Sequence, residues 1–86
     1  MKRRKPTHPG IVFHQDVILP KKITISQVAR ELGVSRKTMS EIINGRCRLS
    51  VVMACKIGNY TKTSSISWLE MQNKLDLWKL ENGEYK

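Results

Sequence analysis

The sequence predicts an all-α fold, a single small domain of five helices with a tight turn between the second helix and the third. A serine or threonine stands just before four of the predicted helices, where its side-chain oxygen can accept a backbone N–H of the first turn. Behind these caps, apolar residues recur three and four positions apart, which is the spacing of one helix face. No stretch alternates polar and apolar residues as a strand would. At 86 residues, the chain has room for one hydrophobic core.

The first helix is expected near Gly10–Leu19, directly after a His-Pro-Gly tripeptide. Pro20 and the Lys21–Lys22 pair should end this helix, because proline cannot donate a backbone hydrogen bond and often stands just past a helix. Residues 1–7 precede the helix as a basic arm, which we expect to be flexible because its adjacent positive charges have nothing apolar to bury. The apolar stripe of the first helix should contain Val12, Phe13 and Val17.

The second and third helices are expected to form a helix-turn-helix motif over about residues 24–44. Thr24 is the predicted N-cap of the second helix, and Gln27 three positions later makes a capping box. Gly33 should end this helix, because a left-handed residue is favoured there. Only three residues then precede the next helix, so the two helices must meet at a sharp corner. The apolar stripe of the second helix contains Ile25, Val28, Ala29 and Leu32.

The third helix, expected over residues 36–44 behind the N-cap Ser35, carries the clearest functional signal. It starts with two cations, Arg36 and Lys37, at the end where the helix dipole favours negative charge. These cations are placed poorly for the helix but well for DNA. The second helix of such a motif lies in the major groove with its N-terminal residues at the base edges. The residues expected to face the core are Met39, Ile42 and Ile43.

We expect nine residues to contact DNA. The polar side of the third helix should contact base edges and phosphates, and the two arginines after it are natural phosphate contacts. The alternative is an ordinary solvated face, in which Lys37 and Glu41 form a weak ion pair four positions apart. The expected DNA-binding residues are Ser35, Arg36, Lys37, Thr38, Ser40, Glu41, Asn44, Arg46 and Arg48.

Two more helices complete the domain, which we expect to span residues 8–81. Ser50 should cap a fourth helix that ends near Tyr60, and Ser64 should cap a long fifth helix that ends with the domain. The tail 82–86 should fray. The fourth helix should bury Met53, Ala54 and Ile57.

The fifth helix has apolar residues on two opposite faces. A single small domain cannot bury both faces, so one should pack on the first and fourth helices while the other meets another chain. The alternative is a helix wrapped entirely within its own domain. The core face contains Trp68, Met71, Leu75 and Trp78. The second face, a predicted interface with another chain, contains Ile66, Leu69, Leu77 and Leu80.

The net charge of +9 is unevenly distributed along the chain. Residues 1–62 carry 13 Lys and Arg against 3 Asp and Glu, whereas residues 63–86 carry 3 against 4. The positive charge is therefore concentrated in the part that contains the helix-turn-helix, which favours a polyanionic partner. Solubilising charge would look the same in composition. The arm could reach a phosphate or the minor groove of DNA, or it could be idle.

Other function classes find little support in the sequence. Cys47 and Cys55 lack metal-ligand spacing, so we expect free thiols in a reducing compartment, with one disulfide as the alternative. His8 and His14 also lack such spacing, and no catalytic motif is present; His8 should be a local cap or turn partner. We expect no enzyme activity, metal or cofactor. Without a long apolar run or a signal peptide, we expect a cytoplasmic protein that does not contact membranes.

From His8 to Trp78, the chain resembles the HigA (VapI-type) antitoxins within the lambda-repressor-like class of helix-turn-helix proteins, the XRE or Cro type. The resemblance rests on His-Pro-Gly at residues 8–10, on LGVSRKTMSEIINGR at residues 32–46, and on WLEMQ and DLW between Trp68 and Trp78. It implies a dimer that neutralises a small RelE-like toxin, an mRNA-cleaving nuclease, and represses its own operon. The second face of the fifth helix is then a predicted dimer or toxin interface. Ile25 stands where these proteins usually have a polar phosphate-contacting residue.

The expected function is therefore a sequence-specific repressor that binds a palindromic operator as a homodimer and serves as the antitoxin of a type II toxin–antitoxin pair. Two alternatives remain open. One is a free-standing regulator of the same fold without a toxin partner. The other is a toxin-binding inhibitor with weak DNA binding, an alternative that Ile25 keeps open.

Overall fold

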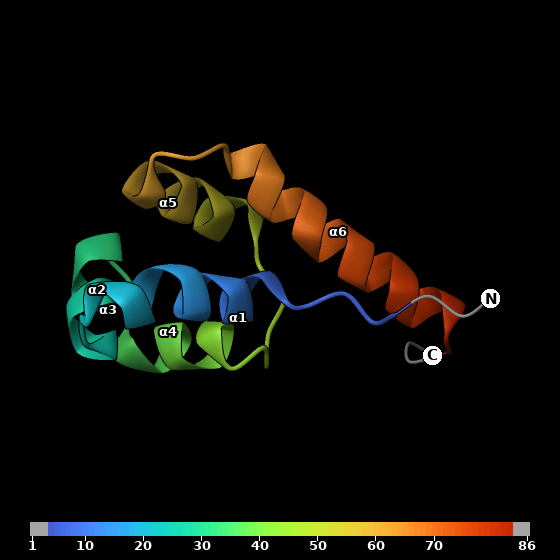
Figure 1. The fold of residues 1–86 in the computed structure, drawn as a ribbon, viewed down its shortest axis with the longest axis horizontal. Helices are drawn as coiled ribbons and strands as arrows, with labels where there is room; N and C mark the ends of the chain where they lie inside the picture. The colour runs from blue at the N-terminus through green and yellow to red at the C-terminus, as the bar shows by residue number, and fades with distance from the viewer. Residues whose placement is uncertain (1–3, 84–86) are drawn as a thin grey trace.

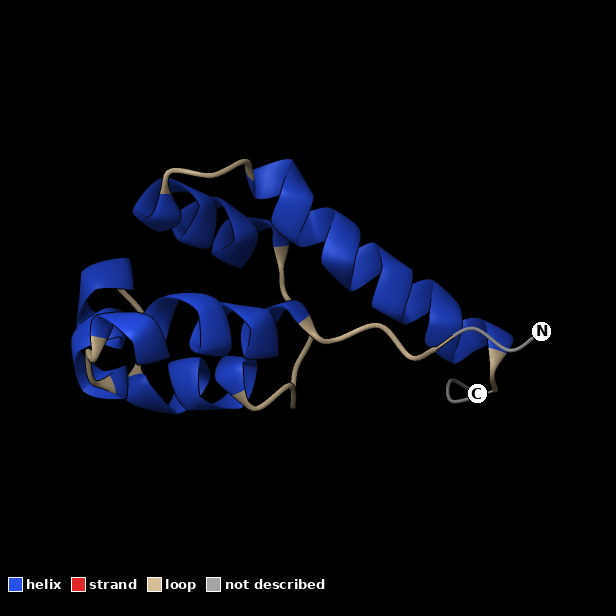
Figure 2. Cartoon of the chain, viewed as in Figure 1, coloured by secondary structure: helices blue, strands red, loops and turns tan. Residues whose placement is uncertain are grey.

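The computed structural model describes residues 4–83, in which an extended N-terminal segment is followed by helices joined by short loops (Figure 2). No strand occurs between residues 4 and 83, as the sequence predicts. The first three elements are continuous with one another, so the described residues form the five expected helical units. The elements are, in order, α1 (Pro9–Phe13), the π-helical turn η1 (His14–Ile18), α2 (Leu19–Lys21), α3 (Ile25–Leu32), α4 (Arg36–Ile43), α5 (Val51–Thr61) and α6 (Ser65–Glu81).

The helices form two groups that enclose the core between them (Figure 1). In one group, α4 contacts both α1 and α3; in the other, α5 packs against α6. Contacts of α1 with α6 and of α3 with α5 join the two groups. The long helix α6 runs past the other helices toward the N-terminal arm, which gives the molecule its elongated shape of 40 × 24 × 23 Å (Figure 1).

The first helical unit differs from the prediction. The helix passes through Pro20 and ends at the Lys21–Lys22 pair, where Lys22 has a left-handed backbone with φ of 56°. The cause is η1, a wide turn in which the Leu19 N–H donates to the carbonyl five residues back. The wide turn accommodates a proline that cannot donate a hydrogen bond and whose ring would crowd the preceding turn.

The π-helical turn also changes which side chains face inward. Phe13 is fully buried, as predicted, but Ile18 is the next buried residue and Val17 is only half-buried. A π-helical turn holds one residue more than an α-helical turn, so the inward direction returns after five residues rather than four. Val12 is half-buried and packs against the edge of the core.

The predicted N-caps of the other four helices are confirmed. Each side-chain oxygen accepts a backbone N–H of the turn that it precedes, so each helix begins where the sequence predicts. Asn44 and Gly45 follow α4 as the expected stop. The capping oxygens accept as follows: Thr24 from Gln27 at 3.0 Å, Ser35 from Thr38 at 3.0 Å, Ser50 from Met53 at 3.1 Å, and Ser64 from Ile66 at 3.2 Å.

Phe13 lies at the centre of the core. Its ring meets those of Tyr60 and Trp68 edge to face, with centroids 6.3 and 6.0 Å apart, so aromatic contacts join the first helix to α5 and α6. The predicted core residues of α4 and α5 are all buried around it. The buried hydrophobic cluster contains Phe13, Ile18, Val28, Ala29, Leu32, Met39, Ile42, Ile43, Leu49, Met53, Ala54, Ile57 and Trp68.

Only one face of α6 is buried. Trp68 and Leu75 are buried, while Met71 and Trp78 of the same predicted face are half-buried. Leu69 of the second predicted face differs from the other three residues, because it is half-buried and packs against the core. The rest of the second face is exposed: Ile66 by 65%, Leu77 by 50% and Leu80 by 61%. No helix within residues 4–83 is long and apolar enough to cross a bilayer.

Candidate nucleic-acid interface

The turn between α3 and α4 has one well-defined backbone conformation. Gly33 has φ of 73°, a left-handed conformation that glycine adopts without strain. The N–H groups of Gly33 and Val34 donate to the carbonyls of Arg30 and Ala29, at 3.1 and 2.9 Å, and so satisfy the end of α3. Ser35 then caps α4. These bonds fix the angle between the two helices of the helix-turn-helix.

The inner side of α4 is held very close to α1. A methyl group added at Gly10 would lie 1.8 Å from the carbonyl oxygen of Ile42, so only glycine permits this approach. Met39, Ile42 and Ile43 are buried, as predicted. Packing on α1 and α3 therefore determines which side of α4 faces solvent.

The outer side of α4 carries the polar residues that the sequence places there. Arg36, Lys37 and Thr38 are exposed at its N-terminus, and its first turn contains no acidic residue. Two local bonds restrain neutral side chains: the Ser35 hydroxyl donates to Thr38 Oγ1 at 2.9 Å, and Asn44 Nδ2 donates to the Ser40 carbonyl at 2.7 Å. Ser40 and Glu41 are half-exposed, and Asn44 is exposed. The arrangement presents hydrogen-bonding groups and two cations on one surface.

The two predicted phosphate contacts beyond α4 differ from one another. They lie on the α4–α5 loop, residues 44–50. Arg46 is exposed, and its backbone N–H donates to the Glu41 carbonyl at 2.9 Å. Arg48 is also exposed, but its Nε donates to Asp76 Oδ2 of α6 at 3.0 Å, and its Nη2 donates to the same oxygen. The sequence does not predict this ion pair, because no local pattern links the two residues.

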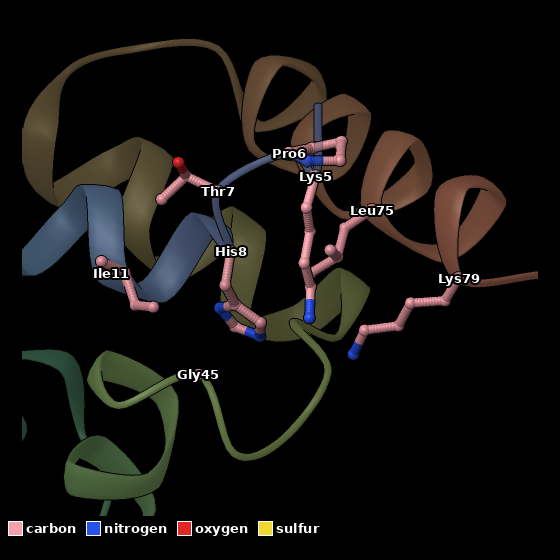
Figure 3. A pocket seen from close by; sticks show the side chains of 8 residues that line it. All are labelled: Lys5, Pro6, Thr7, His8, Ile11, Gly45, Leu75 and Lys79. Atoms are coloured by element: carbon pink, nitrogen blue, oxygen red, sulfur yellow. The ribbon is translucent and has the colours of Figure 1, made fainter. Parts of the chain in front are cut away.

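His8 also holds this loop, in addition to its expected role as a cap. Its Nδ1 accepts the Gly10 N–H at 2.9 Å, which caps α1, and its Nε2 donates to the Cys47 carbonyl at 2.6 Å. This pair of bonds requires a neutral ring with its proton on Nε2. Burial is the main cause that lowers the pKa of His8, and Lys79 lowers it further. Figure 3 shows His8 pointing from the start of α1 toward Gly45, beside a pocket of about 310 Å³.

Gln72 of α6, like Asp76, is a residue whose role the sequence did not predict. It is only 1% exposed, and its Oε1 accepts the Leu49 N–H at 2.8 Å while its Nε2 donates to Asp76 Oδ1 at 2.8 Å. A signal for it was available. Gln72 lies four residues after Trp68 and three before Leu75, on the core face of α6, and a polar residue there must find buried partners.

The arm follows α6 in its described part. The Lys5 ammonium lies 5.5 Å from the centroid of the Trp78 ring, which makes a cation–π contact. The sequence does not predict this aromatic partner for the arm. The first three residues of the predicted flexible arm, and residues 84–86 of the predicted frayed tail, lie outside the described residues.

Both cysteines are free thiols, as predicted. Cys47 lies half-buried in the α4–α5 loop, and burial, followed by the nearby Glu41, raises the pKa of its thiol. The thiol therefore stays protonated at neutral pH. Cys55 is exposed on α5.

Comparison with known proteins agrees with this architecture. Residues 16–57 match the model of the Cro/C1-type HTH DNA-binding domain. The chain is 36% identical to an uncharacterized HTH-type transcriptional regulator of Haemophilus influenzae, over 98% of this chain and 78% of that protein. It is 31% identical to antitoxin HigA-1 of Vibrio cholerae, over 93% and 75%.

Solved structures show the same fold. The Pseudomonas aeruginosa antitoxin HigA, solved with the higBA promoter, superimposes with a TM-score of 0.83 at 30% identity, over 92% of this chain and 88% of that one. The match therefore includes α6 as well as the helix-turn-helix. By sequence and by fold, this chain belongs to the Cro/C1-type helix-turn-helix family, in the group of the HigA (VapI-type) antitoxins.

Proposed function

We propose that this chain is a sequence-specific DNA-binding repressor that also acts as the antitoxin of a type II toxin–antitoxin pair. In this proposal, α4 lies in the major groove of a palindromic operator, and a homodimer places one α4 in each half-site. The antitoxin neutralises a RelE-like, mRNA-cleaving toxin and represses the operon that encodes both proteins.

The observation that carries the DNA-binding part is the outer side of α4. Arg36 and Lys37 are exposed at the end of the helix that enters the groove in proteins of this architecture. Their positions oppose the helix dipole, so the helix itself does not benefit from them. The solved HigA of Pseudomonas aeruginosa, which has the same fold, is in complex with the higBA promoter, and this supports the same role here.

The proposed contacts have distinct roles. Lys37, in the first turn of α4, is assigned to a base edge, and Arg46, beyond the helix, to a backbone phosphate. Lys37→Ala should then weaken binding to the preferred sequence by about 1–3 kcal/mol and relax the preference at one base pair. Arg46→Ala should weaken all sequences alike and reduce the salt dependence by about one phosphate contact.

Fluorescence anisotropy with DNA from upstream of the protein's own gene tests these roles, at several salt concentrations and against scrambled DNA. Lys74→Ala, an exposed lysine on α6, is the matched control for the loss of one positive charge. If Lys37→Ala and Arg46→Ala both bind as tightly as Lys74→Ala, α4 is not the recognition helix.

The homodimer is assigned to the exposed apolar face of α6. A two-fold axis through this face would bring the same patch from both copies together, and the two recognition helices should then lie about 34–36 Å apart. The double substitution Leu77→Asp and Leu80→Asp would place unpaired carboxylates at the contact. Sedimentation should then show monomers. These monomers should remain helical but lose cooperative operator binding. A dimer of unchanged stability would move the dimer contact elsewhere and leave this face to the toxin.

A second candidate is a free-standing transcriptional regulator without a toxin partner. The specific observation in its favour is that relatives from Haemophilus influenzae and Escherichia coli are named as HTH-type transcriptional regulators rather than as antitoxins. Co-expression with the neighbouring reading frame, followed by pull-down, separates the two candidates. A stable complex that blocks mRNA cleavage supports the antitoxin, whereas no complex supports the regulator.

The third candidate, a toxin-binding inhibitor with weak DNA binding, rests on Ile25. This residue is half-buried and packs against the core, so it offers no polar group to a phosphate. A gel shift with the upstream DNA tests it. Tight, sequence-specific binding by the parent protein would exclude this candidate.

A further inference from the structure

We propose that Asp76 of α6 is a positioning residue for DNA binding, which orients Arg48 toward a backbone phosphate with the support of Gln72. This inference rests on the proposed DNA-binding function. It assigns part of that function to a helix that does not itself belong to the helix-turn-helix.

The first support is a connected set of hydrogen bonds between α6 and the α4–α5 loop. Asp76 Oδ2 accepts both Nε and Nη2 of Arg48, while Asp76 Oδ1 accepts from Gln72. Gln72 in turn accepts the N–H of Leu49, the residue next to Arg48. The bonds therefore fix both the side chain of Arg48 and the main chain beside it.

Burial changes steadily along this set of residues. Gln72 is 1% exposed, the Asp76 side chain is 19% exposed and the Arg48 side chain is 61% exposed. The anchor is thus in the core and the cation is at the surface. A guanidinium carries five N–H donors in a planar fork, so Arg48 can remain bonded to Asp76 and also donate to a phosphate.

Orienting an arginine before it meets DNA has a measurable benefit. A free arginine loses side-chain freedom when it binds a phosphate, and that loss reduces affinity. Arg48 has already lost this freedom in the protein. Its neighbour Arg46 lies on the same loop, whose other side is held by the bond from His8 to the Cys47 carbonyl. The main chain beside both arginines is thus held in place.

Asp76→Asn tests the proposal, because positioning and simple electrostatics predict opposite signs. The substitution removes one negative charge, so electrostatics alone predicts tighter binding to DNA. Positioning predicts weaker binding, by about threefold to tenfold in Kd, the cost of ordering one long side chain. Glu70→Gln is the matched control, since Glu70 is exposed on the same helix and undergoes the same charge change.

Two further variants keep the test independent of folding. Arg48→Lys retains the charge but loses the fork, and it should weaken binding as much as Asp76→Asn does. Arg48→Ala combined with Asp76→Asn should bind no more weakly than Arg48→Ala alone, because the two residues act as a unit. Circular dichroism melting confirms that each variant is folded at the assay temperature. If Asp76→Asn unfolds, Arg48→Lys decides the question.

The outcomes separate this inference from the function on which it rests. If the parent protein binds its upstream DNA and Lys37→Ala weakens it, but Asp76→Asn binds as tightly as Glu70→Gln, the positioning role is wrong and the repressor proposal stands. Arg48→Lys with parental affinity would overturn the inference in the same way. A parent protein that does not bind the DNA at all overturns both.

Discussion

The two ends of α4 present their cations by different means. At the N-terminal end, Ser35 caps the helix by accepting the N–H of a residue only three positions away. At the C-terminal end, the α4–α5 loop is held by His8 and by Gln72, whose bonding partners lie 39 and 23 positions away in the sequence. The N-terminal end is therefore held by residues of its own segment, whereas the loop at the other end is held by residues far away in the sequence.

This difference has consequences for how each end responds to change. The N-terminal end depends on the helix-turn-helix alone, so substitutions in the arm or in α6 should leave it unchanged. The α4–α5 loop should respond to both, because His8 precedes α1 and Gln72 lies in the middle of α6. Partners bound to α6 could therefore alter the phosphate contacts without touching the base contacts.

The largest expected effect is on the stability of the whole domain, because both ends of α4 depend on its packing against α1. Gly10→Ala would bring a methyl group against the main chain at Ile42, and since backbone cannot rotate away, α1 and α4 must separate. We expect the free energy of unfolding to fall by about 3 kcal/mol or more. Urea unfolding followed by circular dichroism measures it, with Gln15→Ala in the same helical unit as the control. A variant as stable as this control would contradict the close α1–α4 contact.

The next effect should be confined to the α4–α5 loop and α1. His8→Ala removes the N-cap of α1 and the bond to the Cys47 carbonyl together, and we expect a loss of about 2–3 kcal/mol in the free energy of unfolding. His8→Asn keeps an N-cap acceptor but is too short to reach Cys47, so it should lose about half as much. Equal losses in the two variants would mean that the N-cap contributes nothing, whereas no loss in His8→Asn would mean that the bond to the loop contributes nothing.

A smaller effect should be confined to the N-terminal end of α4. Ser35→Ala deletes the cap that accepts the Thr38 N–H, and we expect a loss of about 1 kcal/mol. Hydrogen exchange should show faster exchange at Thr38 and no change in the loop. Ser67→Ala, at an exposed helical position, is the control. Faster exchange in the loop as well would show that the two ends are not independent.

The smallest expected effect is a pH dependence of the free energy of unfolding that arises from His8. Burial lowers the pKa of His8 below its ordinary 6.5, so the unfolded chain binds a proton more readily than the folded one. The contribution of neutral His8 to the free energy of unfolding is therefore fully present above pH 6.5 and decreases as the pH falls below that value. Urea unfolding of the parent and of His8→Asn, at pH 7.5 and pH 5, isolates this term. A parent that loses no more stability than the variant would show that folding does not lower the pKa of His8.

The same division explains how much the sequence could predict. Ser35, Gly33 and the stripe that contains Met39 are local signals, and they predicted the helix-turn-helix and the exposed side of α4 correctly. The bonds of His8 to Cys47 and of Arg48 to Asp76 join segments far apart in the sequence, and no local pattern specifies such pairs. Leu69 shows the same limit, since a helical wheel gives the direction of a side chain but not the neighbours that cover it.

The wide turn η1 has a consequence for comparing this chain with its relatives. In effect it is a one-residue insertion inside a helix, absorbed without a loop or a gap in the helical backbone. Aligning this segment as a continuous α-helix would equate Val17, rather than Ile18, with the buried position of a relative that lacks the turn. A gap placed between His14 and Ile18 restores the correspondence, and core positions compared across the first helix then refer to the same place in space.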